Sequence, residues 1–182
     1  MRYWYDTEFI EDGHTIDLIS IGMVAEDGRE YYAVSSDFSR VRMLQNQWLV
    51  DNVVPHLPAR KVDQNRGWDW ANFQEDFASG LWKRRPQIKL DLLEFCDRRQ
   101  YGKPEFWGYF SAYDHVALCQ LFGTMMDLPR EWPMYTRDIE QLRDSLGNPA
   151  LPAQPKNAHD ALADARWTRD AHLFLLQYQQ RQ

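Results

Sequence analysis

The amino-acid sequence predicts a single α/β domain spanning residues 1–182, with a mixed β-sheet flanked by α-helices. Three short segments rich in β-branched and aromatic residues open the chain, and most of the remaining chain has helical spacing of apolar residues. The length of 182 residues is enough for one hydrophobic core and short for two. We find no internal repeat and no linker, so the predicted order β-β-β-α-α-β-α-α-α describes one domain.

The predicted opening of the chain is a meander of three strands. Residues 2–6 are rich in aromatic side chains, and residues 15–25 are rich in β-branched and apolar ones, which favours β-strand in both segments. A turn sequence at residues 26–29 (Glu-Asp-Gly-Arg) leads into a further strand at residues 30–34. The second and third strands are therefore expected to pair as an antiparallel hairpin.

The middle of the chain is predicted to be mainly helical. Apolar residues fall at helical spacing over residues 45–54, and Pro55 is expected to end that helix. Residues 55–72 are predicted to form a loop. A longer helix is predicted over residues 86–100, where apolar side chains share one face and Gly102 supplies the stop.

The last third of the chain is predicted to contain one strand and a long terminal helix. Residues 105–110 have strand character, and residues 113–122 form a buried helix that ends at Gly123. Three prolines after Gly147 exclude regular structure up to about residue 158. An alanine-rich helix is then predicted over residues 158–178.

The composition is that of a globular protein without a strong positive field. Hydrophobic residues make up 44% and charged residues 26%, which favours a packed core over disorder. The formal net charge is -6, so any polyanion has to be bound by local contacts rather than by the overall field. The first residues lack an apolar signal-peptide core, and no stretch is long enough for a membrane helix. We therefore expect a cytoplasmic protein without membrane contact.

The cysteines and four of the histidines are predicted to have structural roles. Cys96 and Cys119 each lie in an apolar helical pattern, which favours small core residues over a disulfide or a thiolate metal site. Four histidines lack partners at metal-ligand spacing and are predicted to lie at the surface or in the core: His14, His56, His115 and His172.

Acidic residues occur where the first predicted strand ends and where a later helix begins. Asp6 and Glu8 are two residues apart, and the alternation of a strand sends both side chains to one face, where they could share a cation. The alternative is simple exposure, because acidic residues at strand ends are common and usually lie in solvent. Asp114 opens the helix at residues 113–122, where, taken alone, a first-turn acid is better explained by the helix dipole. Neither place predicts a site by itself.

A third acidic place opens the terminal helix. On a helix, His159 and Asp164 would lie about 140° apart, so they cannot share one face if both are fully helical. His159 is therefore predicted at the frayed start of the helix, as a mobile general base over a metal site that Asp164 enters. Asp160 is expected to interact with the dipole at the helix N-terminus.

Taken in chain order, these residues form Asp-x-Glu, an Asp that follows an aromatic residue, and His-x4-Asp. The order resembles the DEDD exonuclease superfamily in its His-type (DEDDh) branch, and the matching segments are residues 6–8, 113–118 and 159–164. A narrower resemblance, to small actinobacterial 3′-exoribonucleases specific for polyadenylate, rests on residues 2–13 and 108–120. The resemblance implies a ribonuclease H-like fold and 3′→5′ exonuclease activity.

The resemblance also implies a two-metal mechanism. Asp6, Glu8, Asp114 and Asp164 would bind two Mg²⁺ ions, for which Mn²⁺ can substitute, because both are hard cations that prefer oxygen ligands. Asp6 would bridge the two metals, Glu8 and Asp164 would hold the metal that carries the nucleophilic water, and Asp114 would support the second metal through ordered water. His159 would take the proton from that water.

The implied substrate is single-stranded RNA or an RNA 3′ overhang, from which nucleoside 5′-monophosphates are released. Thr7, Phe9 and Ile10 are predicted to bind it, with the last two against the terminal base. Core filling explains Phe9 and Ile10 equally well. The basic and aromatic segment at residues 82–85 (Trp-Lys-Arg-Arg) could grip phosphates, although a solvated loop is the simpler interpretation.

Two alternatives and one departure from the family pattern stand beside this hypothesis. The same residues would suit a DNA 3′→5′ exonuclease of the proofreading type, and a catalytically silent nucleic-acid-binding module is a third class. Many relatives carry Asn where this chain has Phe110, so a polar partner is missing that Ser111 would replace only weakly. Residues 68–70 (Trp-Asp-Trp) could face a second subunit in a homodimer, and a monomer explains them nearly as well.

Overall fold

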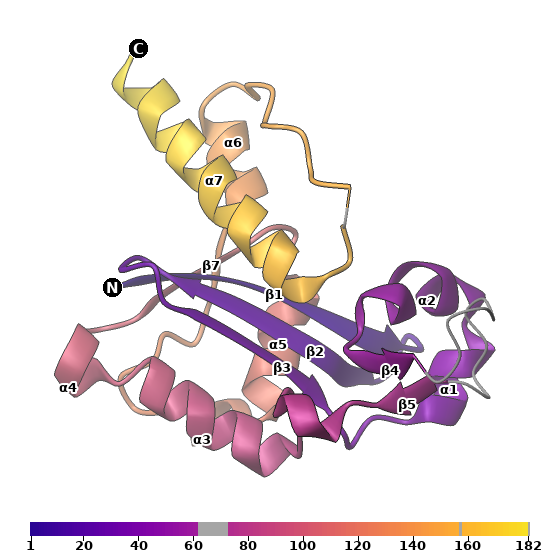
Figure 1. Cartoon of the computed structure of the whole chain (residues 1–182). Coiled ribbons are helices and arrows are strands. Elements are labelled where there is room, and N and C mark those ends of the chain that lie inside the picture. The colour runs from indigo at the N-terminus through magenta and orange to yellow at the C-terminus, as the bar shows by residue number, and fades with distance from the viewer. Residues whose placement is uncertain (62–72, 157, 182) are drawn as a thin grey trace.

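A mixed β-sheet forms the centre of the computed structural model, which describes residues 1–61, 73–156 and 158–181 (Figure 1). The six strands lie in the order β6-β3-β2-β1-β7-β8, and β4 and β5 form a separate two-stranded sheet. Their bounds are β1 Arg2–Glu11, β2 Ile16–Ala25, β3 Glu30–Ser35, β4 Ala59–Lys61, β5 Phe73–Glu75, β6 Trp82–Lys83, β7 Glu105–Gly108 and β8 Arg137–Asp138. Strands β1, β2 and β3 pair antiparallel, whereas β6, β7 and β8 join in parallel. The predicted mixed α/β class is confirmed.

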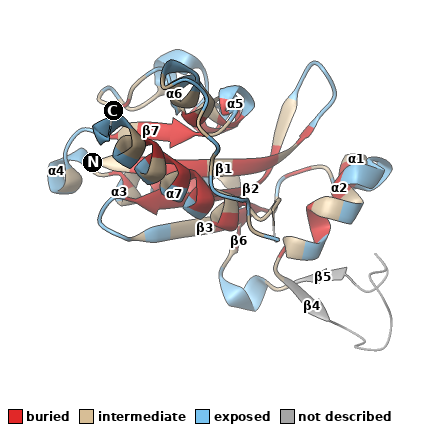
Figure 2. Cartoon of the chain, turned by 90° about the horizontal axis from the view of Figure 1, so that it is seen from above, coloured by how far each residue is buried: buried red, intermediate tan, exposed pale blue. Residues whose placement is uncertain are grey.

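Helices cover both faces of the sheet (Figure 1). Helices α6 and α7 lie on one face, and α3 and α5 lie on the other. Their bounds are α1 Arg40–Gln45, α2 Gln47–Asn52, α3 Arg85–Phe95, α4 Arg98–Tyr101, α5 Ala112–Gln120, α6 Ile139–Ser145 and α7 Ala161–Gln180. Buried residues follow the central strands and the side of α7 that faces them (Figure 2). In the part of the chain that the structure describes, no helix is both long and apolar enough to cross a membrane.

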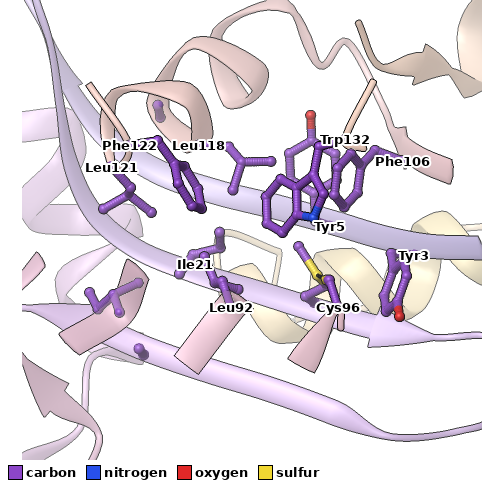
Figure 3. Close-up of a cluster of buried hydrophobic side chains, with 14 of the residues drawn as sticks. Tyr3, Tyr5, Ile21, Leu92, Cys96, Phe106, Leu118, Leu121, Phe122 and Trp132 are labelled. Atoms are coloured by element: carbon purple, nitrogen blue, oxygen red, sulfur yellow. Dashed lines mark hydrogen bonds between the residues drawn. The ribbon is translucent and has the colours of Figure 1, made fainter. Parts of the chain in front are cut away.

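Strand β1 sends alternate side chains to the two faces, and this alternation builds two hydrophobic clusters. Tyr3 and Tyr5 pack with Leu92 of α3 and Leu118 of α5 (Figure 3). Trp4 packs on the opposite face, in the cluster that contains Trp167 of α7. Full burial of such large side chains stabilises a fold by ~1.5–3 kcal/mol each. The same alternation directs the next two even-numbered residues of β1 toward α7.

Strand β1 is longer than the sequence predicts. The expected strand covers residues 2–6, but β1 runs to Glu11, so Asp6 and Glu8 lie inside the strand rather than at its end. The reason is that β2 pairs with it along its whole length, with one irregularity between Glu8 and Phe9. On its other side β1 pairs with β7 only from Arg2 to Trp4, so that edge is open beside the two acids.

The predicted antiparallel pairing of residues 15–25 with 30–34 is confirmed, and so is a long terminal helix, which begins at Ala161 rather than at residue 158. The single helix predicted at residues 45–54 is wrong, because Asn46 ends α1 and its side chain caps α2. The helix predicted at 86–100 is likewise divided. It ends at Phe95, and the Asp97 carboxylate accepts a hydrogen bond from Arg99 N that starts α4.

Two short segments differ from the prediction, and one lies outside the described residues. A loop is expected over residues 55–72, but β4 occupies Ala59–Lys61. Strand β6 is not predicted, since two residues that pair with the sheet edge have no periodicity of their own. The tryptophans at positions 68 and 70, which could face a second subunit, lie outside the described residues.

The buried histidine of α7 and one cysteine have the core roles that the sequence predicts. His172 is 1% exposed, and its Nδ1 accepts a hydrogen bond of 2.9 Å from Trp4 Nε1. The Trp107 ring centroid lies 3.8 Å from the imidazole centroid, and burial lowers the pKa of His172 to about 4. Cys96 is buried and unpaired, whereas Cys119 is partly buried and unpaired.

The first turn of α7 lies directly on the backbone of β2 at Gly22. A Cβ atom at this position would lie 2.3 Å from Ala161 O and 2.4 Å from the Cα atom of Leu162. Both are backbone atoms, so no side-chain rotation could relieve the overlap. Gly22 is the β2 partner of Asp6, and the absence of a side chain there lets the helix start approach that acid.

Replacing Gly22 by alanine is expected to lower the free energy of unfolding by about 1–3 kcal/mol, and Gly22→Val by more, because the overlap grows with side-chain size. Urea unfolding followed by circular dichroism measures both. The control is Gly13→Ala, where φ is +82° and nothing lies within 4 Å of the added Cβ. Its cost of ~1 kcal/mol comes from backbone strain alone. A cost at Gly22 that does not grow with side-chain size would contradict the steric explanation.

Candidate active site

A pocket of about 440 Å³ opens between β1, α2, the loop after β7 and the start of α7. All five residues that the sequence predicts to be catalytic line this pocket: Asp6, Glu8, Asp114, His159 and Asp164. They come from three parts of the chain, residues 6–8, 114 and 159–164, and the tertiary fold brings these parts together. The predicted set is therefore one cluster in space.

Asp114 is fixed by Thr7, its neighbour across the open edge of β1. The Asp114 Oδ1 atom accepts hydrogen bonds from Thr7 N at 2.8 Å and from Thr7 Oγ1 at 2.6 Å. Since β7 stops pairing at Trp4, this carboxylate takes a backbone N–H that a strand neighbour would otherwise bind. Burial raises the pKa of Asp114 to about 6, although the bonds from Thr7 act in the opposite direction. Thr7 is predicted to bind substrate, and in the structure its hydroxyl donates to Asp114.

Asp6 and Glu8 project from β1 toward the start of α7. Glu8 is 8% exposed, and burial followed by repulsion from Asp164 and Asp114 raises its pKa to about 8. The pKa of Asp6 is raised well above its usual value by burial and then by the charges of Asp114 and Glu8. The neighbouring acids therefore make ionisation of Asp6 and of Glu8 less favourable.

Asp164 lies in the first turn of α7 and holds the residue that precedes the helix. Its Oδ2 atom accepts a hydrogen bond of 2.6 Å from the backbone N of His159. Its Oδ1 atom is buried and has no hydrogen-bond partner among the described residues. A buried carboxylate oxygen without a partner is costly, which is typical of a position that binds a cation or an ordered water.

His159 lies outside the helix, as the sequence predicts, with a positive φ of 73°. Asp160 is the N-cap, and its carboxylate accepts hydrogen bonds from Leu162 N and Ala163 N, which gives it the predicted place at the helix N-terminus. The His159 imidazole contacts the Trp48 ring edge-on, with 4.7 Å between the ring centroids. Trp48 thus supports the ring of the predicted general base from α2.

The donor atoms of the pocket suit a divalent cation. One carboxylate oxygen each from Glu8 and Asp164 lies within 4.8 Å of the other, close enough to share a cation, and a ring nitrogen of His159 lies within the same distance of both. Of the described residues that line the pocket, none is a lysine or an arginine, so no permanently charged cationic side chain there offsets the four carboxylates. Carboxylate oxygens are the preferred ligands of Mg²⁺ and Mn²⁺. The arrangement could therefore hold such cations and would be stabilised by them.

Aromatic residues form much of the remaining pocket wall. Phe9, predicted to bind substrate, lines it and meets Tyr113 with 6.0 Å between ring centroids. Ile10 is 3% exposed and packs in a hydrophobic cluster away from the pocket, as in the core role considered for it. Trp48 and Tyr109 also line the pocket, and the sequence does not single them out because an aromatic residue has the same local pattern in a core.

Neither Ser111 nor the basic segment at residues 82–85 contributes a polar group to the pocket. Ser111 does not supply a polar group to the pocket, because it is 1% exposed and its N and Oγ both donate to Asp138 Oδ2. The basic segment at residues 82–85 is not a loop and is not part of the pocket, since it forms β6 and the start of α3. Its cations form ion pairs with aspartates: Lys83 with Asp91, Arg84 with Asp37 and Arg85 with Asp17.

Comparison with known proteins gives one family and two similar curated proteins. A family model described as "3'-5' exoribonuclease Rv2179c-like domain" matches residues 1–176. The chain is 50% identical over 166 residues, 91% of its length and 88% of theirs, to 3'-5' exoribonucleases of two Mycobacterium tuberculosis strains, Rv2179c of H37Rv and MT2234.1 of CDC 1551.

Among solved structures, one chain in the structure of the yeast NOT1 MIF4G domain co-crystallized with CAF1 has a TM-score of 0.44 at 10% identity, and the match covers 97% of this chain and 79% of that one. A likeness this low does not assign a fold family. The sequence matches do assign one, because the family model extends over almost the whole chain and includes every acidic residue of the pocket. This chain therefore belongs to the Rv2179c-like family of 3'-5' exoribonucleases.

Proposed function

We propose that this protein is a metal-dependent 3'-5' exoribonuclease that removes nucleoside 5′-monophosphates one at a time from the 3′ end of single-stranded RNA. The observation that carries the proposal is the convergence of four carboxylates and His159 in one pocket whose described lining residues include no lysine or arginine. The names of the relatives support RNA as the substrate. The proposal places the fold in the ribonuclease H-like group, with β1 as its central catalytic strand.

The four carboxylates are the groups that would hold two Mg²⁺ or Mn²⁺ ions. When bound, such ions supply charge neutralisation and clamp the attacking and leaving oxygens of a displacement at phosphorus. Thr7 holds Asp114 in one orientation, and the backbone N of His159 holds Asp164 in another. Both contacts fix a carboxylate before substrate arrives, which reduces the reorganisation needed during the reaction.

His159 is the proposed general base. Its imidazole takes a proton from the attacking water, the new P–O bond forms, and the bond to the 3′-oxygen of the preceding nucleoside breaks. The proton is then available for the departing 3′-oxygen, so the products are a nucleoside 5′-monophosphate and RNA one residue shorter with a free 3′-hydroxyl. The Trp48 contact limits the positions that the imidazole can take.

A direct assay of nuclease activity tests the proposal. RNA and DNA oligonucleotides of the same sequence, labelled at the 5′ end, are incubated with Mg²⁺, Mn²⁺ or chelator and resolved on a sequencing gel. Wild type is expected to shorten RNA stepwise from the 3′ end only with metal, and Asp6→Asn is expected to lose this activity. The exposed Asp170→Asn is the matched control and should retain it. Shortening of DNA at an equal rate would contradict an RNA-specific enzyme, and no shortening of either would exclude the function.

Replacing His159 by alanine is expected to lower kcat by about 10²–10⁴-fold while leaving Mn²⁺ affinity, measured by calorimetry, within a few-fold of wild type. The variant His159→Asn distinguishes the loss of the imidazole from a change in backbone strain, because Asn tolerates the positive φ angle at this position. It should be as inactive as the alanine variant and more stable. His14→Ala, at an exposed turn, is the matched control. Turnover close to wild type in either His159 variant would remove the general-base role.

The acidic pocket also predicts a pH dependence of stability that metal cancels. The pKa values of Glu8, about 8, and Asp114, about 6, exceed the ordinary 4.5 and 3.8, so the folded protein retains protons that the unfolded chain has released. With chelator, the free energy of unfolding should therefore fall by roughly 2–4 kcal/mol as pH rises from 5 to 8.5. Saturating Mn²⁺ should restore it at the upper end. Glu8→Gln is expected to flatten this decline, and an unchanged decline in that variant would contradict the assignment.

A further inference from the structure

Phe110 combines two unfavourable features at the edge of the pocket. Its φ angle is +52°, a left-handed conformation that bulky residues rarely adopt. Its aromatic side chain is 65% exposed, although it lines the pocket. An exposed ring contributes little to folding, and the backbone conformation costs ~1–3 kcal/mol. Strain of this kind is maintained where the position of the side chain serves a function.

The segment around Phe110 is firmly held. Ser111 N and Oγ donate to Asp138 Oδ2 at 2.8 Å and 3.1 Å, and Ala112 N donates to Phe110 O at 3.0 Å. On the other side, the Tyr109 ring lies between Phe110 and Trp167, with centroid distances of 4.4 Å and 4.9 Å. Trp167 belongs to the core of α7. The Phe110 ring is therefore a preorganised apolar surface rather than a loose loop residue.

The pocket has aromatic walls on two sides of its carboxylates. Trp48 and His159 form one wall, and Trp48 comes from α2, which follows β3 in the chain. Phe110 follows β7, and β7 and β3 lie on opposite sides of the β1–β2 pair in the sheet. The acids of β1 lie between the walls, so the attacking and leaving positions of a phosphate bound at the carboxylates can face opposite walls.

We propose that Phe110 is the stacking platform for the penultimate nucleobase, that of the nucleoside whose 3′-oxygen is the leaving group. The inference rests on the proposed function and on His159 as general base. In an in-line displacement the leaving oxygen lies opposite the attacking water. Since the water is activated on the His159 side, the nucleoside that leaves lies on the opposite side, where Phe110 is exposed.

The charge of the pocket favours stacking as the means of holding the strand. None of its described lining residues is a lysine or an arginine, so no such side chain on this wall can bind the phosphates of the strand. The strand would be held here by contacts to its bases. Stacking of a base on an aromatic side chain contributes ~1–3 kcal/mol and accepts any base, because every base has a π-face. Phe110 therefore selects a single-stranded end with an unstacked penultimate base, without selecting its identity.

A kinetic cycle tests the proposal. Two RNA substrates are compared, identical except that the penultimate ribose of one lacks its base. Phe110→Gly, which also relieves the positive φ, is expected to lower kcat/KM on the intact RNA by about 5–150-fold and to leave kcat/KM on the abasic RNA unchanged. Equal losses on the two substrates would mean that Phe110 only shapes the pocket, and would overturn the proposal.

Further variants separate the aromatic ring from its bulk. Phe110→Trp is expected to match or exceed wild type on intact RNA, whereas Phe110→Leu, which keeps apolar volume without a π-face, should lose most of the effect. Tyr135→Ala removes an aromatic ring that is 59% exposed and does not line the pocket, and it is the matched control with unchanged kcat/KM. Activity of Phe110→Leu equal to wild type would argue against stacking.

A binding measurement distinguishes failure of this inference from failure of the proposed function. RNA with 2-aminopurine at the penultimate position and a phosphorothioate at the terminal linkage is titrated with protein in Ca²⁺, where cleavage is slow. Stacking should quench the 2-aminopurine fluorescence with wild type and not with Phe110→Gly. Wild-type quenching without any RNA shortening would leave the stacking site valid and reject the nuclease. Shortening by wild type with no difference in quenching between the two proteins would reject the stacking site.

Discussion

The contact between the first turn of α7 and the β2 backbone at Gly22 determines how closely the pocket residues approach one another. Gly22 pairs with Asp6, so the helix start that carries Asp164 is placed against the strand that carries Asp6 and Glu8. A side chain at position 22 would hold the helix away from the sheet. The partial positive charge at the N-terminus of α7 also offsets some of the repulsion among these acids.

The carboxylate cluster is an unfavourable arrangement that the rest of the fold supports. Burial raises the pKa of all four acids, repulsion from other acids of the cluster adds to this at Asp6 and Glu8, and Asp164 keeps an oxygen without a partner among the described residues. Hydrophobic clusters on both faces of the sheet stabilise the strands and helices that carry these acids. Backbone strain occurs at the pocket as well, at Phe110 and His159. Carboxylate repulsion and backbone strain thus both destabilise the folded protein at the pocket, where the proposed reaction requires side chains in fixed positions.

Local pattern predicts the long elements and fails at the short ones. The hairpin of β2 and β3 and the helix α7 have periodicity over ten or more residues or a clear turn between strands, so they can be recognised. Strands β6 and β8 have two residues each, and only their neighbours in the sheet define them. Asn46 divides a predicted helix through a capping bond, and pairing with β2 extends β1 beyond its predicted end.

The α/β class is predictable from the strand and helix patterns, and the five predicted catalytic residues from the chain order of three short motifs, which needs no coordinates. How these residues meet follows from the folded chain alone: Thr7 fixes Asp114, the His159 backbone holds Asp164, and Ile10 lies in the core. Trp48 and Phe110 became visible as pocket walls only there. The physical reason is that exposure, strain and charge repulsion depend on distances between residues that are remote in the chain.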